Sequence, residues 1–453
     1  MPLHDLRLAA LSIRRTPALT ALMVGAIAAG IGAAVVTITL YHARAGHPIG
    51  WKEDRLYAVT LDARSMDPEL TQYSRHPEYP PFQLTYRDAQ ALYRSQIPER
   101  AVRMFKAMRV VDPGRSGLQP FSVIARMTSA DFFQMFDVPF LYGSGWSRAA
   151  DDAPEPVVVL GKHLNDKVFG GANSVGRFIT LSGRQYRVIG VTDSWMPQPK
   201  FYDLNNGAFD LPEDLYLPFA WGTTLQLFPS GNFNCLSKNV QITTYHDILT
   251  TECAWLQYWV ELPTRAQRQR FQEFVDNYVT DQKRYGRFPR PLNNRIVNVT
   301  HWLAMNDVVG DESRMEVALA LMFLGVCVLN TLGLMLAKFL GAAPITGLRR
   351  ALGATRADIV RQHLTEVIVV GLLGGLAGLA LAWPGLQIIR ILTYTPGIDD
   401  NPARLALAQA LVHIDFPMLI LALAISLMTG TLAGLYPAWR IGRLAPAAFL
   451  KAQ

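Results

Sequence analysis

The sequence has little charge for its length, and this shortage limits the classes of protein to which it can belong. Of its 453 residues, 17% are charged and 50% are hydrophobic, and the mean hydropathy is +0.14. Disordered chains contain fewer apolar residues, and soluble domains carry about 25% charged residues. A disordered chain and an ordinary soluble domain are therefore both disfavoured.

Sequence motifs that mark catalytic or nucleotide-binding sites are missing as well. The pattern G-x-x-x-x-G-K-[ST] does not occur, because the only Gly-Lys pair, Gly161-Lys162, lacks the upstream glycine and the following Ser or Thr. H-E-x-x-H, C-x-x-C and G-x-S-x-G are also missing. The chain is not expected to bind ATP through a phosphate-binding loop, and the sequence predicts no catalytic residue, metal site or cofactor of its own.

What the sequence does contain is four long runs without any charged residue. They cover residues 18–40, 317–337, 367–389 and 416–439, and each is 21 to 24 residues long. A bilayer core is crossed by about 20 apolar residues of helix, and a helix satisfies its own backbone in lipid. The runs therefore predict four membrane spans, the first of which is too long for a signal peptide.

The distribution of charge predicts how these spans are oriented. The net charge is +7, and the positive residues outside the long segment between the first two spans gather mainly in three short segments. These residues are Arg7, Arg14 and Arg15, then Lys338, Arg349, Arg350, Arg356 and Arg361, and finally Arg440, Arg443 and Lys451. Because Lys and Arg are retained on the cytoplasmic side, both termini and the loop after the second span are expected there. Nucleic acid is not needed as a partner.

Between the first two spans lies a segment with the texture of a folded α+β domain. Residues 41–316 contain 30 basic and 30 acidic residues. Alternating or apolar segments predict strands at 56–61, 157–160, 178–181 and 186–191, with a hairpin at 182–184. Helices are expected at 84–95 and 264–284, the second with Thr264 as N-cap and Phe271, Phe274, Val275 and Tyr278 on one face.

These features together predict a four-span α-helical membrane protein with a large α+β domain inserted between spans one and two. The expected order is an amphipathic cytoplasmic helix at 1–15, a span at 16–41, an external domain at 42–315 with a subdomain boundary near 150, and a span at 316–338. A cytoplasmic loop at 339–363, a span at 364–391, a short external loop at 392–414, a span at 415–439 and a cytoplasmic tail at 440–453 complete the chain.

Two further patterns each leave two interpretations open. Cys235 and Cys253 lie 18 positions apart in the external domain and either form a disulfide, which an oxidising exterior permits, or remain unpaired. The spans contain glycines at G-x-x-x-G spacing, which allows close helix approach and serves either packing within the chain or a dimer interface. These glycines are Gly371, Gly374, Gly375, Gly378, Gly430 and Gly434.

Several segments resemble one known family. Residues 347–359 (GLRRALGATRADI), followed by a glycine-rich span, and residues 434–446 (GLYPAWRIGRLAP) are similar to the FtsX-like permease signature of MacB-type ABC transporters, also called mechanotransmission or type VII systems. Residues 128–146 (TSADFFQMFDVPFLYGSGW) and 156–191 resemble the MacB-like periplasmic core domain. The resemblance covers nearly the whole chain in the right order.

This resemblance implies a multi-pass protein of the bacterial inner membrane whose inserted domain lies in the periplasm. It implies a dimer of permeases driven by a separate ATPase dimer, which would hold the ATP and Mg. A helix at about residues 348–358 would dock on that ATPase. The coupling residues that the motif implies are Gly347, Leu348, Arg349, Arg350, Leu352, Gly353, Ala354, Arg356 and Asp358.

The sequence departs from the family pattern at two points. MacB carries its ATPase in the same chain, so here the ATPase is expected to be a partner subunit. Relatives usually have Glu just before the Ile-Gly-Leu-Arg-Arg segment, whereas this chain reads Pro344-Ile345-Thr346-Gly347, which favours a non-identical second permease.

The family resemblance also gives expectations for cargo. It implies export of an antibiotic, peptide or lipopeptide from the periplasm with an adaptor and an outer-membrane duct. The alternatives are a lipoprotein-extracting permease and an FtsX-like signalling scaffold that regulates a cell-wall hydrolase.

Overall fold

The computed structural model describes residues 3–69, 76–114, 117–238, 240–393, 405, 408 and 416–442. The chain forms two compact units. The α+β unit is Gly46–Val308, and the helical unit combines Met1–Ala45 with Val309–Gln453. The long insertion between the first two apolar helices therefore folds as a body of its own.

Twelve strands of the described α+β unit form one sheet, in which the main path runs in the order β12-β1-β11-β3-β4-β9-β6-β8-β5. Strands β2 and β10 pair with β11, and β7 pairs with β3 and β8. The strands are β1 (Leu56–Thr60), β2 (Leu84–Thr85), β3 (Arg100–Asp112), β4 (Phe121–Thr128), β5 (Phe140–Gly143), β6 (Val157–Leu160), β7 (Phe178–Leu181), β8 (Arg184–Thr192), β9 (Leu215–Pro218), β10 (Asn234–Cys235), β11 (Cys253–Glu261) and β12 (Arg295–Asn298).

The helices of this unit cover both faces of the sheet. They are η1 (Gly50–Lys52), α4 (Tyr86–Tyr93), α5 (Phe132–Met135), η2 (Arg148–Asp151), α6 (Lys162–Phe169), η3 (Phe201–Asn206), α7 (Ala220–Thr224), α8 (Tyr245–Thr250), α9 (Arg265–Arg284) and α10 (Val299–Met305). One apolar core contains residues of α4, α6, α7, α8 and α9. The other contains residues of α5, η3 and α10.

Strand β1 shows how the sheet separates these two cores. Its side chains alternate, so that Tyr57 and Val59 join the first core, whereas Leu56 and Ala58 join the second. Successive side chains of a strand point to opposite faces, and because both faces are covered every residue of β1 is buried. A strand buried on both faces is uniformly apolar rather than alternating.

Several local predictions from the sequence are confirmed in this unit. Strands β7 and β8 form the expected antiparallel hairpin, and Ser182 and Gly183 both have positive φ in its turn, as a two-residue type I′ hairpin requires. Thr264 caps α9 by accepting from the backbone N–H of Gln267. Phe271 and Val275 of α9 are fully buried.

The structure bears on two further expectations for this unit, one for a helix and one for a subdomain boundary. The helix expected at 84–95 is shorter, because residues 84–85 pair with β11 as β2 and α4 begins only at Tyr86. The subdomain boundary expected near residue 150 falls at η2, and strands on both sides of it, such as β4 and β9, pair within the same sheet.

The helical unit contains α1 (Leu3–Arg15), α2 (Pro17–Arg44), α11 (Asp311–Gly341), α12 (Ala343–Ala351), α13 (Arg356–Thr393) and α15 (Phe416–Gly442). Among the described residues, three helices are long and apolar enough to cross a membrane, over Pro17–Arg44, Glu312–Gly341 and Arg356–Leu392. In α15 the apolar stretch is Leu423–Pro437. The expected external loop at 392–414 and tail at 440–453 lie mostly outside the described residues.

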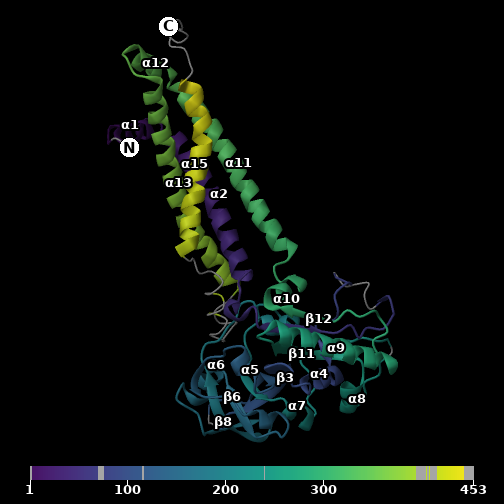
Figure 1. Cartoon of the computed structure of the whole chain (residues 1–453). Coiled ribbons are helices and arrows are strands. Elements are labelled where there is room, and N and C mark those ends of the chain that lie inside the picture. The colour runs from purple at the N-terminus through teal and green to yellow at the C-terminus, as the bar shows by residue number, and fades with distance from the viewer. Residues whose placement is uncertain are drawn as a thin grey trace. The chain divides into compact units, whose positions relative to one another are not determined.

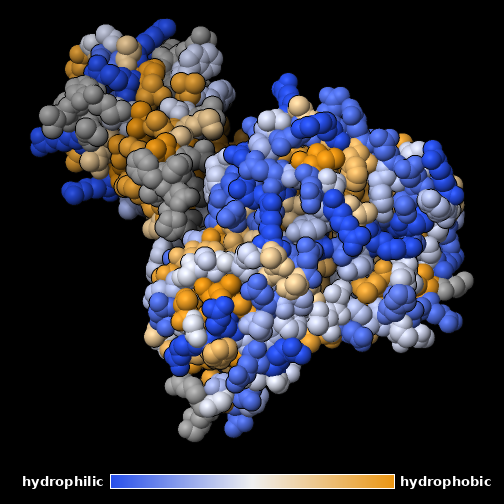
Figure 2. Space-filling view, turned by 60° about the horizontal axis from the view of Figure 1, so that its bottom comes forward, coloured by the Kyte–Doolittle hydropathy of each residue, from blue (hydrophilic) through white to orange (hydrophobic). Residues whose placement is uncertain are grey.

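Within the helical unit, α2 and α15 each contact both α11 and α13, so the four long helices lie side by side (Figure 1). Figure 2 shows hydrophobic residues gathered over this unit, whereas hydrophilic residues dominate the visible face of the α+β unit. Large apolar side chains stay exposed on α11, including Phe323 and Leu329. Such a surface is stable in lipid or against another apolar helix, not in water.

Candidate functional site

The segment expected to form one coupling helix at 348–358 is divided between two helices. Helix α12 ends at Ala351, and α13 begins at Arg356. Gly353 has a φ of +105°, a conformation that favours glycine and that ends helices. Thr355 and Asp358 then cap α13 reciprocally: the Asp358 N–H donates to Thr355 Oγ1 at 3.2 Å, and the Thr355 N–H donates to Asp358 Oδ2 at 3.1 Å. The predicted bounds of the coupling helix were wrong because this glycine and this cap were overlooked.

The leucines of the coupling segment point away from the helical unit. The side chains of Leu348 and Leu352 are 57% and 79% exposed, and Ile345 on the preceding turn is also exposed. Positions 345, 348 and 352 lie on one face of a helical path. The arginines of α12 behave differently, since Arg349 is half-buried and donates to Gln362 Oε1. The exposed residues of α12 are therefore mainly apolar, whereas Arg356 and Asp358 are exposed at the start of α13.

The remaining residues of the coupling motif are spread over α12, the turn and α13. Gly347 lies in α12, and a Cβ placed there would meet no atom within 4 Å. Ala354 follows the turn, and Arg356 is exposed at the start of α13. Arg350 is half-buried at the end of α12. The nine residues thus share one end of the helical unit without forming one continuous helix.

Beneath this segment, a buried ion pair joins α11 to α13. Lys338 Nζ lies 2.5 Å from Glu366 Oε1, and the two side chains are 4% and 3% exposed. Ser12 of α1 donates to the same carboxylate oxygen at 2.9 Å. Lys338 also donates to Thr20 Oγ1 of α2 at 3.3 Å. Four helices therefore meet on two opposite charges, which are stable out of water only when paired and hydrogen-bonded.

The glycines at G-x-x-x-G spacing pack helices within the chain. A Cβ on Gly374 would lie 2.5 Å from Ile27 Cγ2, and one on Gly378 would lie 2.9 Å from Ile31 Cβ, both on α2. A Cβ on Gly430 would lie 3.1 Å from the Cα of Gly371. Gly375 is also buried, and a Cβ on Gly434 would collide with Val367. Backbones approach closely where these residues lack side chains.

One side of α11, in contrast, has no neighbour among the described residues. Its buried residues lie along one side, at positions 313, 320, 324, 327, 331, 335, 338 and 339. Most of its other described residues are exposed, and the polar Asn330 is among them. Polar amides within spans typically bond across helix interfaces. This surface is a candidate for pairing with another membrane-spanning chain.

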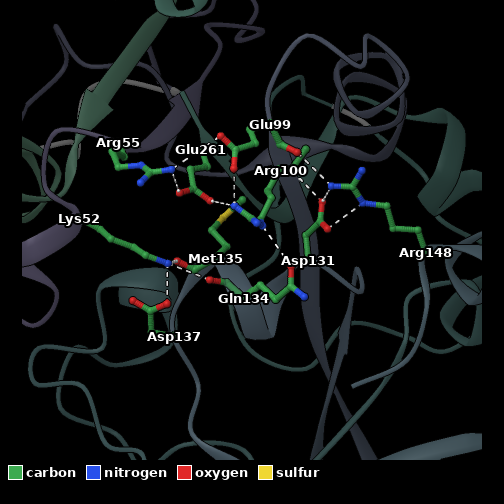
Figure 3. Close-up of polar contacts among 11 residues, drawn as sticks. Lys52, Arg55, Glu99, Arg100, Asp131, Gln134, Met135, Asp137, Arg148 and Glu261 are labelled. Atoms are coloured by element: carbon green, nitrogen blue, oxygen red, sulfur yellow. Dashed lines mark hydrogen bonds and ion pairs between the residues drawn. The ribbon is translucent and has the colours of Figure 1, made fainter. Parts of the chain in front are cut away.

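In the α+β unit, charged residues gather where β1 and β3 begin and β11 ends (Figure 3). We call this the strand-end cluster; it comprises Lys52, Arg55, Glu99, Arg100, Asp131, Gln134, Asp137, Arg148 and Glu261. Glu261 is 1% exposed and pairs with Arg100 at 2.7 Å and with Arg55 at 3.0 Å. Arg148 Nε lies 2.8 Å from Asp131 Oδ1, and this hydrogen bond raises the pKa of Arg148.

The strand-end cluster holds the segment that follows α2. Lys52 Nζ bonds to Asp137 Oδ1 at 2.6 Å and to the carbonyl of Gln134 at 2.8 Å. Trp51 Nε1 donates to Asp137 Oδ2 at 2.8 Å. The chain between α2 and β1 is thereby fixed to the end of α5. A segment held by several direct bonds moves with the body that it contacts.

The segment that precedes α11 is fixed in the same way. Within the α+β unit, β1 and β12 are antiparallel neighbours, with Tyr57 opposite Asn298. Glu53 Oε1 accepts from the Thr300 N–H at 2.9 Å, and Trp302 Nε1 donates to the carbonyl of Phe201 at 2.9 Å. The chain leaving α2 and the chain approaching α11 are therefore tied to each other and to the same sheet.

A second buried charge network lies deeper in the α+β unit. Arg126 pairs with Asp203 and Glu213, and all three side chains are fully buried. Lys200 Nζ lies 2.7 Å from Glu213 Oε1. Burial alone would raise the pKa of Glu213, but Arg126 and Lys200 lower it well below its usual range. This network joins η3 to β4 and stabilises the fold of the α+β unit.

The two external cysteines are joined in the structure. Cys235 of β10 lies opposite Cys253 of β11 in antiparallel register, and their Sγ atoms are bonded at 2.04 Å. Cys327 is buried in α11 as a free thiol. Among the residues that the structure describes, no His, Cys, Asp or Glu residues are grouped as metal ligands.

Sequence reasoning missed the buried pair of Lys338 and Glu366. Lys338 was counted only among the basic residues that orient the spans, and no partner was predicted for it. The helices in fact extend past the charge-free runs, from Asp311 to Gly341 and from Arg356 to Thr393. The available signal was that one basic and one acidic residue each lie directly beside an apolar run.

Comparison with known families identifies both parts of the chain. Residues 20–277 match the MacB-like periplasmic core domain. Residues 317–446 match the FtsX-like permease C-terminal region. The two matches follow the order of the apolar helix, the α+β unit and the further apolar helices.

Curated relatives include the pyoverdine export ATP-binding/permease proteins PvdT. The protein of Pseudomonas aeruginosa is 25% identical over 325 residues, which are 72% of this chain and 42% of that protein. The protein of Pseudomonas syringae pv. syringae is 24% identical over 83% of this chain and 50% of its own length. The chain thus spans at most about half the length of these relatives.

Solved structures give more distant matches. The periplasmic region of MacB from Actinobacillus actinomycetemcomitans is 14% identical and matches with a TM-score of 0.36, over 58% of this chain and 98% of that one. The extracellular domain of the noncanonic ABC-type transporter YknZ from Gram-positive bacteria is 11% identical, with a TM-score of 0.33, over 54% and 100% of the two chains.

Proposed function

Because this chain belongs to the family of ABC transporter permeases with a MacB-like periplasmic core domain and an FtsX-like C-terminal region, we propose that it transmits conformational change from a cytoplasmic ATPase to its external α+β unit. The family implies an ATPase partner, and in this proposal ATP and Mg belong to that separate subunit. The permease itself contributes no catalytic residue. Both termini lie in the cytoplasm, and the α+β unit lies in the periplasm.

The observation that carries the proposal is the pair of connections at the ends of α2 and α11. In the helical unit, Arg44 at the end of α2 lies 3.2 Å from Ser313 Oγ and 3.7 Å from Glu316, both on α11. In the α+β unit, the continuing chains pair as β1 and β12. Displacement of the two helices therefore acts on one edge of one sheet rather than on a loose loop.

The exposed face of α12 supports a docking site at the other end of α2 and α11. Ile345, Leu348 and Leu352 present apolar side chains outside the helix bundle, and Arg350 lies on the same helix. Apolar contacts with a basic rim suit an acidic groove on a partner, since charge complementarity guides association. We place the ATPase on this face.

A second permease completes the proposed assembly. The unpartnered side of α11, with Asn330 among exposed apolar residues, is the surface on which we place it. Packing and interhelical hydrogen bonds hold spans together in lipid. Whether the second permease is a copy of this chain or a non-identical relative is decided by the composition of the purified complex.

We infer that the cargo is an antibiotic, peptide or lipopeptide exported from the periplasm, with an adaptor and an outer-membrane duct. Support comes from relatives named for pyoverdine export. The neutral balance of charge in residues 41–316 gives no preference for cargo of one sign.

Purification of the tagged chain from its native membrane in mild detergent tests this proposal. Recovery of an ABC ATPase with an adaptor supports export, whereas recovery of a cell-wall hydrolase favours the signalling alternative. Recovery of an ATPase with lipoproteins favours extraction. If no ATPase is recovered under conditions that preserve the permease pair, the proposal is contradicted.

A matched pair of variants locates the docking face. Leu348→Asp places a charge on the exposed apolar face of α12 and should reduce ATPase recovery at least tenfold. Leu292→Asp makes the same change at a leucine that is 52% exposed in the α+β unit and should leave recovery unchanged. Equal recovery with both variants would place the ATPase elsewhere.

A further inference from the structure

A cavity lies among α1, α2, α11, α12 and α13 within the helical unit. Its volume is about 700 Å³, which falls within the usual range for small-molecule sites. Helix α1 lies against α13 in this unit (Figure 1). It contributes Leu8, Leu11, Ser12 and Arg15 to the lining, a spacing of three, four and seven residues that defines one helix face.

Two more helices line the cavity with faces of the same spacing. Helix α12 contributes Ile345 and Arg349, and α13 contributes Ile359, His363 and Glu366. Each of these helices thus contributes both apolar and polar residues to the lining. Such a lining suits a molecule that has both a polar and an apolar part.

The charges that line the cavity are mostly positive. Arg15, Lys338 and Arg349 are basic, and Glu366 is the acidic residue among the described lining. Glu366 is already paired with Lys338 at 2.5 Å, and Arg349 donates to a neutral amide, that of Gln362. Neither arginine is paired with a carboxylate of the lining, and the carboxylate of Asp358, which interacts with Arg349, lies outside it. Guanidinium groups are well suited to phosphate because they donate two parallel hydrogen bonds.

His363 supplies an independent observation. It lines the cavity, is 6% exposed and packs against the ring of Phe339 with centroids 4.2 Å apart. Its Nδ1 has no hydrogen-bond partner among the described residues. Buried polar nitrogens are nearly always bonded, so this atom indicates a partner that the described residues do not provide.

From these features we propose that the cavity binds the phosphate headgroup of an anionic phospholipid, with the apolar residues of α1 and α12 against its acyl chains. The proposal rests on the proposed function only in placing α1 and α12 at the cytoplasmic leaflet. Anionic lipids are attracted to basic sites of this kind between spans. A bound lipid would bridge α1 to the coupling segment through Arg15 and Arg349.

Native mass spectrometry of the delipidated full-length permease, without ATPase, tests the proposal. Phosphatidylglycerol and phosphatidylcholine are titrated separately, and phosphatidylglycerol should bind at least tenfold more tightly. Arg15→Gln combined with Arg349→Gln should remove this preference, since each basic group near a lipid surface contributes about fivefold. Arg14→Gln, which changes a neighbouring exposed arginine outside the lining, should preserve it.

A variant with unchanged charge provides a second route. Leu11→Trp enlarges a partly exposed lining residue of α1 and should weaken phosphatidylglycerol binding without altering helix content. Equal binding of the two lipids, or an unchanged preference in the double arginine variant, would overturn the proposal. Displacement of the lipid by millimolar inorganic phosphate would show that a free anion is the ligand and would also overturn it. These outcomes are measured on the permease without ATPase, so they are separate from the recovery of ATPase with Leu348→Asp.

Discussion

Lys338 and Glu366 form a buried ion pair in which Nζ and Oε1 lie 2.5 Å apart, near the segment that connects α11 to α13. The pair also binds Ser12 of α1 and Thr20 of α2. These two charges fix the register of four helices, because the sliding of any one helix would separate a buried charge from its ion-pair or hydrogen-bond partner. The apolar contacts around them have no comparable directionality.

Removal of one partner of this pair should destabilise the helical unit. Glu366→Gln leaves Lys338 buried without a counter-charge, and the free energy of unfolding in detergent should fall by about 3–5 kcal/mol. Lys338→Met combined with Glu366→Leu removes both charges and should recover most of that loss. Glu312→Gln, at an exposed glutamate of α11, is the control. A Glu366→Gln variant as stable as this control would contradict the role of the pair.

Two glycines of the coupling segment should respond oppositely to alanine. Gly353 has a φ of +105°, so Gly353→Ala should destabilise by about 1–3 kcal/mol through backbone strain. Gly347 lies within α12, and a Cβ added there would meet no atom within 4 Å, so Gly347→Ala should stabilise by up to about 1 kcal/mol through helix propensity. Thermal unfolding of the purified permease compares the two. A Gly353→Ala variant at least as stable as the wild type would show that Gly353 is not required for the turn.

Asp151 should make the α+β unit less stable as the pH rises. Burial raises its pKa from 3.8 to about 6, although hydrogen bonds from Ala130, Tyr93 and Trp146 oppose the shift. The folded state therefore binds this proton more tightly than the unfolded state. Its contribution of about 3 kcal/mol is complete below pH 3.8 and is lost as the pH rises through 6.

The variant Asp151→Asn isolates this effect. The difference in unfolding free energy between the wild type and Asp151→Asn should fall between pH 4 and pH 7, as measured by tryptophan fluorescence in urea. Asp152→Asn provides the charge control at an exposed neighbour. A difference that is independent of pH would show that Asp151 stays ionised in the folded protein.

The bond between Cys235 and Cys253 should stabilise the α+β unit. It closes a loop with a sequence separation of 18, which corresponds to about 3 kcal/mol in the chain-entropy treatment. Cys235→Ser combined with Cys253→Ser should lower the free energy of unfolding by this amount, and dithiothreitol should lower that of the wild type similarly. A destabilising effect of dithiothreitol on the double variant would indicate another cause.

The sequence predicts helix starts and turns correctly where they depend only on neighbouring residues. Thr264 marks the start of α9, and Ser182-Gly183 marks a hairpin, because capping and turn formation depend on neighbouring residues. Thr355 and Gly353 carry an equally local signal for a break in the coupling segment, which was overlooked.

Other features depend on which helices and strands become neighbours. Lys338 and Glu366 are 28 positions apart, and Arg126 meets Asp203 across 77 positions. No pattern within α11 or β4 identifies these partners, since they become neighbours only when the whole unit folds. Strands with one exposed face alternate apolar and polar residues. Strands β1 and β11 do not show this alternation, because helices cover both faces of the sheet.

The central claim is that ATP bound by a partner ATPase rearranges the external α+β unit through α2 and α11. The most direct measurement is the distance between a spin label on Val175→Cys, an exposed position of the α+β unit, and a label on the external domain of the paired permease. In the complex with its ATPase, ATP and vanadate should shift the distance distribution, and Leu348→Asp should abolish the shift. An unchanged distribution in a complex that binds and hydrolyses ATP would contradict the account.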